Sequence, residues 1–239
     1  MHEIEDWDDL RRRLHPEDRR CFAFFHPAMP GEPLIFVEVA LTRAIPGSIQ
    51  ALLAEDRDPL LIEDARTAVF YSISNCQKGL AGISFGNLLI KQVASGLLQE
   101  LPQLSSFVTL SPVPGFLRWL EATTPEAAEA LQAGGNGAAE LAAHYLKDAK
   151  RPDGYPADPV ARFHLGNGAA IHEVHAQADT SDKGRAQSAG VMVNYIYDLS
   201  QTEQNHEAFA LQQAVAASKS IQAKARAGQA SLKSINSGK

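Results

Sequence analysis

The feature that most constrains the fold is a strand, a glycine-rich loop and a helix in direct succession. Residues 67–74 alternate in the manner of a strand, residues 75–86 contain three glycines, and residues 88–98 carry apolar side chains at helical spacing. This order is typical of α/β domains, in which a helix packs back onto the sheet. Because unpaired N–H groups gather at a helix start, the loop is also a candidate site for a phosphate or pyrophosphate.

Further segments of the sequence also predict an α/β fold. The apolar run at residues 34–41 predicts a central strand, and residues 21–25, 107–110 and 191–199 predict others. Residues 162–165 and 169–176 are expected to be extended. From Ser218 onward the chain has five Lys or Arg residues and no acid, so we expect a disordered or weakly helical tail. The predicted organisation is one folded domain over residues 1–212 and a basic tail over 213–239.

Charge and composition exclude several classes of protein. The formal net charge is -6, which disfavours a nucleic-acid partner held through phosphates. Only Cys21 and Cys76 are present, without metal-ligand spacing, so neither a disulfide framework nor a structural zinc site is indicated. No apolar stretch is long enough to span a membrane, and no targeting signal is apparent. We expect a cytoplasmic protein with no membrane partner.

The glycine loop matches neither of the common phosphate-binding fingerprints. It lacks the Gly-Lys-Ser/Thr of a Walker A loop, and its glycine spacing fails G-x-G-x-x-G. The spacing Cys76-x-x-Gly79-x-Ala81 resembles the acetyl-coenzyme A loop of the acetyltransferase (GNAT) fold, although Cys76 departs from the usual Arg or Gln. A glycine turn that serves packing alone remains the alternative.

Ser111 and His164 form the second candidate site. Ser111 follows a predicted strand, and a serine hydroxyl needs a partner imidazole to take or give its proton. A simple Ser-Pro turn and a structural histidine are the alternatives, and the absence of G-x-S-x-G disfavours serine hydrolase chemistry.

His172 and His175 lie three apart on a predicted strand and so face opposite sides, which disfavours a metal site. We interpret the basic run at residues 11–13 as a solvated surface.

Five blocks of sequence together resemble one family. They are HPAMPGEPLIFVEVALT (26–42), YSISNCQKGLAGISFGNLLIKQV (71–93), TLSPVPGFLRWL (109–120), FHLGNGA (163–169) and VMVNYIYDL (191–199). In this order they resemble the catalytic domain of the malonyl-coenzyme A (malonyl-CoA) decarboxylases. The resemblance covers about residues 7–209, is weak over 123–158, and does not extend into the tail from residue 218.

The resemblance implies a single GNAT-like α/β domain, a mixed sheet flanked by helices. It implies a carboxy-lyase that converts malonyl-CoA to acetyl-CoA and CO2 without a metal or organic cofactor, with Ser111 and His164 as catalytic residues. The substrate-binding residues that it implies are Gly79, Ala81, Gly82, Ile83, Ser84, Phe85, Gly86, Asn87, Ser72, Asn167 and Tyr197.

Three departures from the family pattern bear on this interpretation. Ser84 stands where animal members carry a glutamate, and His175 with Ala176 replaces an expected Asn-Trp pair. The family's N-terminal helical domain, its main assembly surface, is not in this sequence, so a homo-oligomer is possible but not implied. An acyl-CoA transferase of GNAT type and a non-catalytic coenzyme A-binding protein are the alternative functions.

Overall fold

The computed structural model describes residues 7–77, 79 and 86–237. These residues divide into two compact units, Met1–Leu110 and Ser111–Lys239, which are described separately. Within the described residues, none of the helices combines the length and the apolar character needed to cross a membrane.

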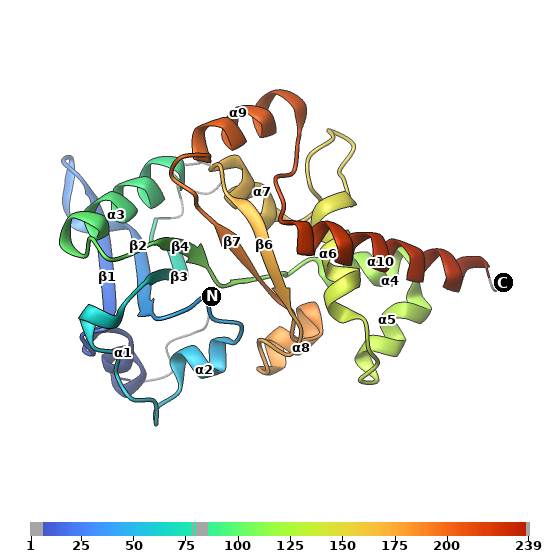
Figure 1. Cartoon of the computed structure of the whole chain (residues 1–239), viewed down its shortest axis with the longest axis horizontal. Helices are drawn as coiled ribbons and strands as arrows, with labels where there is room; N and C mark the ends of the chain where they lie inside the picture. The colour runs from blue at the N-terminus through green and yellow to red at the C-terminus, as the bar shows by residue number, and fades with distance from the viewer. Residues whose placement is uncertain (1–6, 78, 80–85, 238–239) are drawn as a thin grey trace. The chain divides into compact units, whose positions relative to one another are not determined.

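The N-terminal unit is built on a mixed sheet (Figure 1). Strand β1 (Arg19–His26) pairs antiparallel with β2 (Met29–Thr42), which pairs antiparallel with β3 (Thr67–Asn75); β3 in turn runs parallel to β4 (Ser106–Thr109). Residues 37–41 of β2 are all buried, as expected for a central strand. The register between β2 and β3 shifts at Glu38 and Val39, where Glu38 faces Ser72 and Val39 faces Phe70. This bulge leaves Tyr71 without a directly opposite residue.

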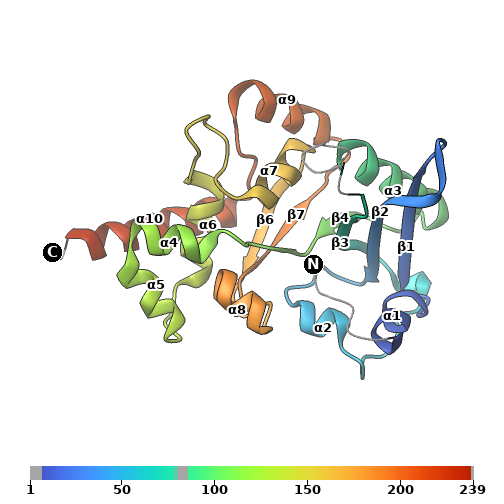
Figure 2. The same cartoon turned by 180° about the vertical axis from the view of Figure 1, so that it is seen from behind.

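Helices of this unit begin at recognisable signals. Helix α1 (Trp7–Leu14) precedes the sheet, and the short α2 (Ile49–Leu53) is capped by Ser48, whose hydroxyl accepts from the N–H of Ala51. A 3-10 turn, η1 (Ile62–Asp64), leads into β3. After the glycine loop, α3 (Gly86–Glu100) buries an apolar stripe that includes Ile90, Val93 and Leu97. Both Figure 1 and Figure 2 show α3 beside the strands. The predicted strand and helix are confirmed, and most of the loop between them lies outside the described residues.

The C-terminal unit is organised around β7 (Met192–Ile196). This strand pairs antiparallel with the two-residue β5 (Ser111–Pro112) and with β6 (Ala170–His175). The helices of the unit are α4 (Phe116–Thr123), α5 (Pro125–Gln132), α6 (Ala138–Asp148), α7 (Pro159–Gly166), α8 (Asp182–Ser188), α9 (Thr202–Gln212) and α10 (Lys219–Ser237). The extended chain predicted at 169–176 is therefore confirmed as β6.

Two expectations differ from the structure in this unit. Residues 162–165 lie in α7 and are not extended, because Asp158 caps the helix and Pro159 occupies its first position, a start signal that we did not use. The tail, which we expected to be disordered or weakly helical, forms the regular helix α10, which begins after Ser218, whose hydroxyl accepts from the N–H of Ile221 at 3.1 Å.

Helix α10 packs along α6 (Figure 1), and it does so through a narrow stripe of buried residues. The stripe consists of Ile221, Ala225, Gly228 and Leu232, spaced three or four apart. A Cβ at Gly228 would lie 2.2 Å from the backbone oxygen of Glu140, so the two helices approach as closely as backbones can. The small residues Ala225 and Gly228 in this stripe let the tail pack closely against α6.

Candidate active site

Ser111 lies where the chain leaves the N-terminal sheet and enters the second unit. The strand β4 ends at Thr109, and the chain then forms the short β5, in which Ser111 pairs with Val193 of β7. The proline that follows cannot extend the ladder, so β5 stops at once. The Ser111 side chain is buried, with 6% of the residue exposed. The backbone thus places this hydroxyl inside the unit and not on a surface turn.

His164 projects from the last turn of α7. The carboxylate of Asp158 accepts hydrogen bonds from the N–H groups of Val160 and Ala161, both at 2.9 Å, and so fixes the start of the helix. Asp158 is itself fully buried. The helix is short, so its rigid start also fixes the position of the imidazole near its end.

The structure brings the two predicted catalytic residues together. Ser111 Oγ and His164 Nε2 lie 3.2 Å apart, within hydrogen-bond distance. On the other side of the ring, His164 Nδ1 lies 2.8 Å from the hydroxyl of Tyr197, a predicted substrate-binding residue. A hydroxyl can donate or accept, so either nitrogen of the neutral ring can carry the proton.

An aromatic wall supports the imidazole. The ring of Tyr195 is stacked on that of His164, with centroids 4.6 Å apart and an angle of 25° between the planes, and Phe163 meets it edge-on. Tyr195 lies on β7 and Tyr197 directly follows its last residue, and the side chains of both contact His164. Tyr195 was not among the site residues predicted from the sequence, although its spacing to Tyr197 on a predicted strand would have indicated it.

Burial keeps this site electrically neutral. His164 is 4% exposed, and desolvation lowers the pKa of its imidazole to about 3. Burial likewise raises the pKa of Tyr197 well above its ordinary value. Around neutral pH both side chains are therefore uncharged. A serine, a neutral imidazole and a phenol in contact can pass a proton but present no fixed charge.

Asn167 is the predicted substrate-binding residue with the most unusual environment. It is 1% exposed, and neither its side-chain oxygen nor its side-chain nitrogen has a hydrogen-bond partner among the described residues. Its backbone N–H donates to the carbonyl of His164 at 3.1 Å, so it lies one helical turn beyond the imidazole. A buried amide left without partners costs about 1 to 3 kcal/mol for each unsatisfied group. Such groups often mark a place that a ligand completes.

The remaining predicted binding residues belong to the N-terminal unit. Ser72 is buried on β3, with its hydroxyl 3.4 Å from that of Ser74. At Gly79 an added Cβ would meet nothing within 4 Å among the described residues, so packing does not require a glycine there. Gly86 and Asn87 open α3. The other predicted loop residues lie outside the described residues; they are Ala81, Gly82, Ile83, Ser84 and Phe85.

One of the two histidines considered for a metal site, His175, contacts a buried amide instead. His175 Nε2 lies 2.5 Å from the side-chain oxygen of Asn194, which is fully buried on β7. Over residues 7–77, 79 and 86–237, no group of three or more His, Cys, Asp or Glu side chains is arranged to hold a metal ion. His175 stands, together with Ala176, where the family pattern led us to expect an Asn-Trp pair.

Comparison with solved structures first defines the fold class. The GNAT-like decarboxylase GphF, solved in complex with isobutyryl-CoA, aligns with a TM-score of 0.51 at 21% identity. The alignment covers 79% of this chain and 82% of the GphF chain. The loading GNATL domain of CurA from Lyngbya majuscula aligns with a TM-score of 0.55 at 15% identity. The chain therefore has a GNAT-like fold, a mixed sheet flanked by helices, as predicted.

Comparison of sequences then defines the family. The model of the malonyl-CoA decarboxylase C-terminal domain matches residues 1–140 and 126–235, so the chain belongs to this family. The crystal structure of malonyl-CoA decarboxylase from Agrobacterium vitis aligns with a TM-score of 0.88 at 49% identity, covering 94% of this chain and 61% of that one. The corresponding structure from Rhodopseudomonas palustris gives 0.84 at 48% identity, covering 92% and 59%.

A curated relative shows how much of a longer protein this chain matches. The mitochondrial malonyl-CoA decarboxylase of Anser anser anser is 39% identical over 254 residues, which cover 87% of this chain and 50% of that protein. The chain thus spans about half the length of the curated relatives it matches. The family match also extends through most of α10, beyond the boundary predicted at residue 212.

Proposed function

We propose that this chain decarboxylates malonyl-CoA to acetyl-CoA and CO2, acting as a carboxy-lyase. One observation carries the proposal: in a member of the malonyl-CoA decarboxylase family, Ser111 and His164 meet in a buried hydrogen bond of 3.2 Å. Their residue types and contact fit a site that handles a proton away from bulk water.

The reaction sets two requirements. The bond between the carboxylate carbon and the α-carbon breaks, and its electron pair moves into the thioester to form an enolate as CO2 leaves. The site must stabilise negative charge on the thioester oxygen and then deliver one proton to the α-carbon. No electron acceptor is needed, because the thioester itself holds the charge between the two steps.

The buried residues of the second unit can meet both requirements. We assign the hydroxyl of Ser111 to the thioester oxygen and to proton delivery, with His164 Nε2 replacing the proton that Ser111 gives up. Tyr197 holds Nδ1 of the ring at 2.8 Å and so orients the imidazole. Because His164 is neutral, it does not bind the substrate carboxylate through a salt bridge, which would stabilise the ground state.

Substrate-binding roles follow from the same reasoning. The unpartnered amide of Asn167 is assigned to a polar group of the malonyl thioester, which would supply the hydrogen bonds that the protein lacks. The glycine loop from Gly79 to the start of α3 is assigned to the pyrophosphate of coenzyme A. Binding that remote anion can position the malonyl group for reaction. Ser72 is assigned to a further polar contact with the substrate.

The test is acetyl-CoA formation from malonyl-CoA by the purified chain. Ser111→Ala and His164→Ala should each lower turnover by roughly 10²-fold or more, the usual scale for lost acid–base or oxyanion help. The double variant should cost little more than the worse single variant, because the two residues act as a unit. Near-parent turnover in a folded single variant would remove the catalytic assignment.

The same assay separates the alternatives. Transfer of the acyl group to an added amine would indicate a transferase, and tight coenzyme A binding without turnover would indicate a binding protein. A homo-oligomer is a further proposal, which light scattering over a concentration series tests. A cytoplasmic location likewise remains a prediction from the sequence.

A further inference from the structure

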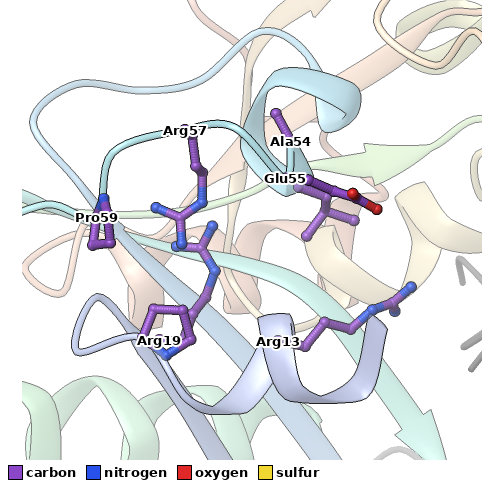
Figure 3. Close-up of a pocket in the computed structure, with 8 residues that line it drawn as sticks. Arg13, Arg19, Ala54, Glu55, Arg57 and Pro59 are labelled. Carbon is purple, nitrogen blue, oxygen red and sulfur yellow. The ribbon is translucent and has the colours of Figure 1, made fainter. Parts of the chain in front are cut away.

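A hollow of about 120 Å³ in the N-terminal unit is lined chiefly by arginine (Figure 3). Arg13 comes from α1, Arg19 is the first residue of β1, and Arg57 lies in the loop after α2. Arg13 and Arg19 are each only 4% exposed, and the Arg57 side chain is 21% exposed. Arginine side chains are rarely buried without a counter-charge, so the charges around the hollow must be counted.

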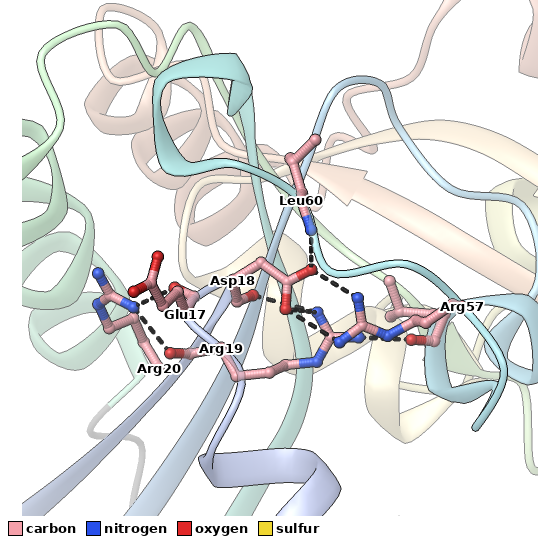
Figure 4. Close-up of polar contacts among 7 residues, drawn as sticks. Glu17, Asp18, Arg19, Arg20, Arg57 and Leu60 are labelled. Carbon is pink, nitrogen blue, oxygen red and sulfur yellow. Dashed lines mark hydrogen bonds and ion pairs between the residues drawn. The ribbon is translucent and has the colours of Figure 1, made fainter.

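One carboxylate serves two of these guanidinium groups. Asp18 accepts hydrogen bonds from Arg57 at 2.5 and 2.9 Å and from the N–H of Leu60 at 2.9 Å, and it lies 3.3 Å from Arg19 (Figure 4). Although burial opposes it, hydrogen bonds from Arg57 and Leu60 lower the pKa of Asp18, so this carboxylate is charged. It neutralises one of two arginines and leaves one positive charge in excess.

The other charged groups do not cancel this excess directly. Arg13 is paired with the buried Glu38 at 3.9 Å. In Figure 3 the guanidinium groups of Arg19 and Arg57 lie side by side, while that of Arg13 points to the opposite side of the hollow. Glu55, the one acidic residue that lines the hollow, is exposed and extends away from Arg19 and Arg57. The excess charge therefore lies at the Arg19–Arg57 end.

Arg19 also has a donor without an acceptor. Its terminal nitrogens donate to the backbone carbonyls of Asp18 at 3.1 Å and Leu52 at 2.6 Å. Its Nε is buried and has no hydrogen-bond partner among the described residues. Asp18 does not supply one, because its carboxylate contacts a terminal nitrogen of Arg19 and not Nε. A buried charged donor is costly to leave unpaired, which favours an acceptor from outside the chain.

We propose that this hollow binds a small phosphate-type oxyanion at Arg19 and Arg57. A tetrahedral oxyanion presents several acceptor oxygens, and paired guanidinium groups are well suited to bind it through parallel N–H donors. The volume accommodates one such anion with ordered water, given about 30 Å³ for each water molecule. The anion could be free phosphate or the phosphoryl group of a larger ligand. The negative charge of Glu55 at the margin weakens binding of either.

Calorimetric titration of the full chain with inorganic phosphate, at constant ionic strength set with chloride, tests the proposal. Saturable binding is expected, and Glu55→Gln should tighten it by about two- to fivefold, the scale of a partly exposed charge pair. Glu63→Gln removes an exposed acid of the same unit that does not line the hollow, and it should leave the affinity unchanged. Arg57→Gln should weaken binding by about tenfold or more.

Competition identifies the source of the anion. If coenzyme A displaces phosphate, the hollow takes a phosphoryl group of that molecule; if both bind together, it takes a separate anion. The proposal is overturned if phosphate shows no saturable binding, or if Glu55→Gln and Glu63→Gln have the same effect. Glu55→Gln leaves the Asp18 contacts intact, so the test does not depend on Arg57→Gln folding normally.

Discussion

Burial of His164 predicts a specific loss of stability in mild acid. The unfolded chain accepts a proton on this imidazole below about pH 6.5, whereas the folded chain holds the pKa near 3. The unfolded state therefore binds more protons over this range, and stability falls as the pH falls from 6.5 toward 3. Each pH unit of that window costs about 1.4 kcal/mol.

The size of the effect between two convenient pH values can be worked out. At pH 7.5 the histidine is neutral in both states and contributes almost nothing. At pH 5.0 it is about 1.5 pH units below its unfolded pKa, so folding is disfavoured by about 2 kcal/mol through this group alone. His164→Gln removes the titrating ring and should remove this part of the pH dependence.

Urea unfolding at the two pH values measures the difference. Trp119 packs against the ring of Tyr145 with centroids 5.1 Å apart in the same unit as His164, so its fluorescence reports the relevant unfolding. The parent should lose about 2 kcal/mol more than His164→Gln on going to pH 5.0. Lys233→Ala, an exposed change on α10, should behave like the parent. Equal losses in the parent and His164→Gln would show that the imidazole is not held neutral by burial.

Four further outcomes are expected. Tyr197→Phe should lower turnover by about tenfold, with little change in KM, because His164 Nδ1 loses its oriented partner. Asn167→Ala should impair acetyl-CoA formation and leave the urea midpoint unchanged or raised, since it removes unsatisfied polar atoms. Gly228→Ala should destabilise the C-terminal unit by about 1 to 3 kcal/mol, seen as a lower urea midpoint, because the new methyl group meets a backbone oxygen of α6. Gly82→Val, outside the described residues, should weaken binding of free coenzyme A in calorimetry.

The sequence predicted best where a segment carries its own signal. The buried β2 and the succession of β3, loop and α3 follow from local apolar patterns, so they could be found without tertiary information. The pairing of Ser111 with His164 could not be derived that way, because 53 positions separate the two residues. The family resemblance indicated the pair, and the structure supplied the 3.2 Å contact.

Other features depend on neighbours that no single segment reveals. Helix α10 has only three large apolar residues, Ile221, Leu232 and Ile235, and its docking also depends on the backbone of α6 approaching Gly228. Arg13 belongs to a run that we interpreted as a solvated surface, yet it is buried because α1 lies over the sheet next to Glu38. Tyr195 supports His164 only because β7 and α7 pack together. In each case a tertiary contact outweighs the local pattern.

The two hydroxyl contacts of His164 have a consequence for how protons return to the site after each turnover. A carboxylate at Nδ1 would fix one tautomer, but Tyr197 can either give or receive the proton there. Tyr197 can therefore give a proton to Nδ1 while Nε2 gives one to Ser111, and Tyr197 must take up a proton from water in the same step, because burial disfavours a phenolate. The imidazole exchanges tautomers and never becomes a cation, which its buried position would strongly disfavour. Turnover would then have more than one proton in motion, and the rate in mixtures of light and heavy water should curve with deuterium content.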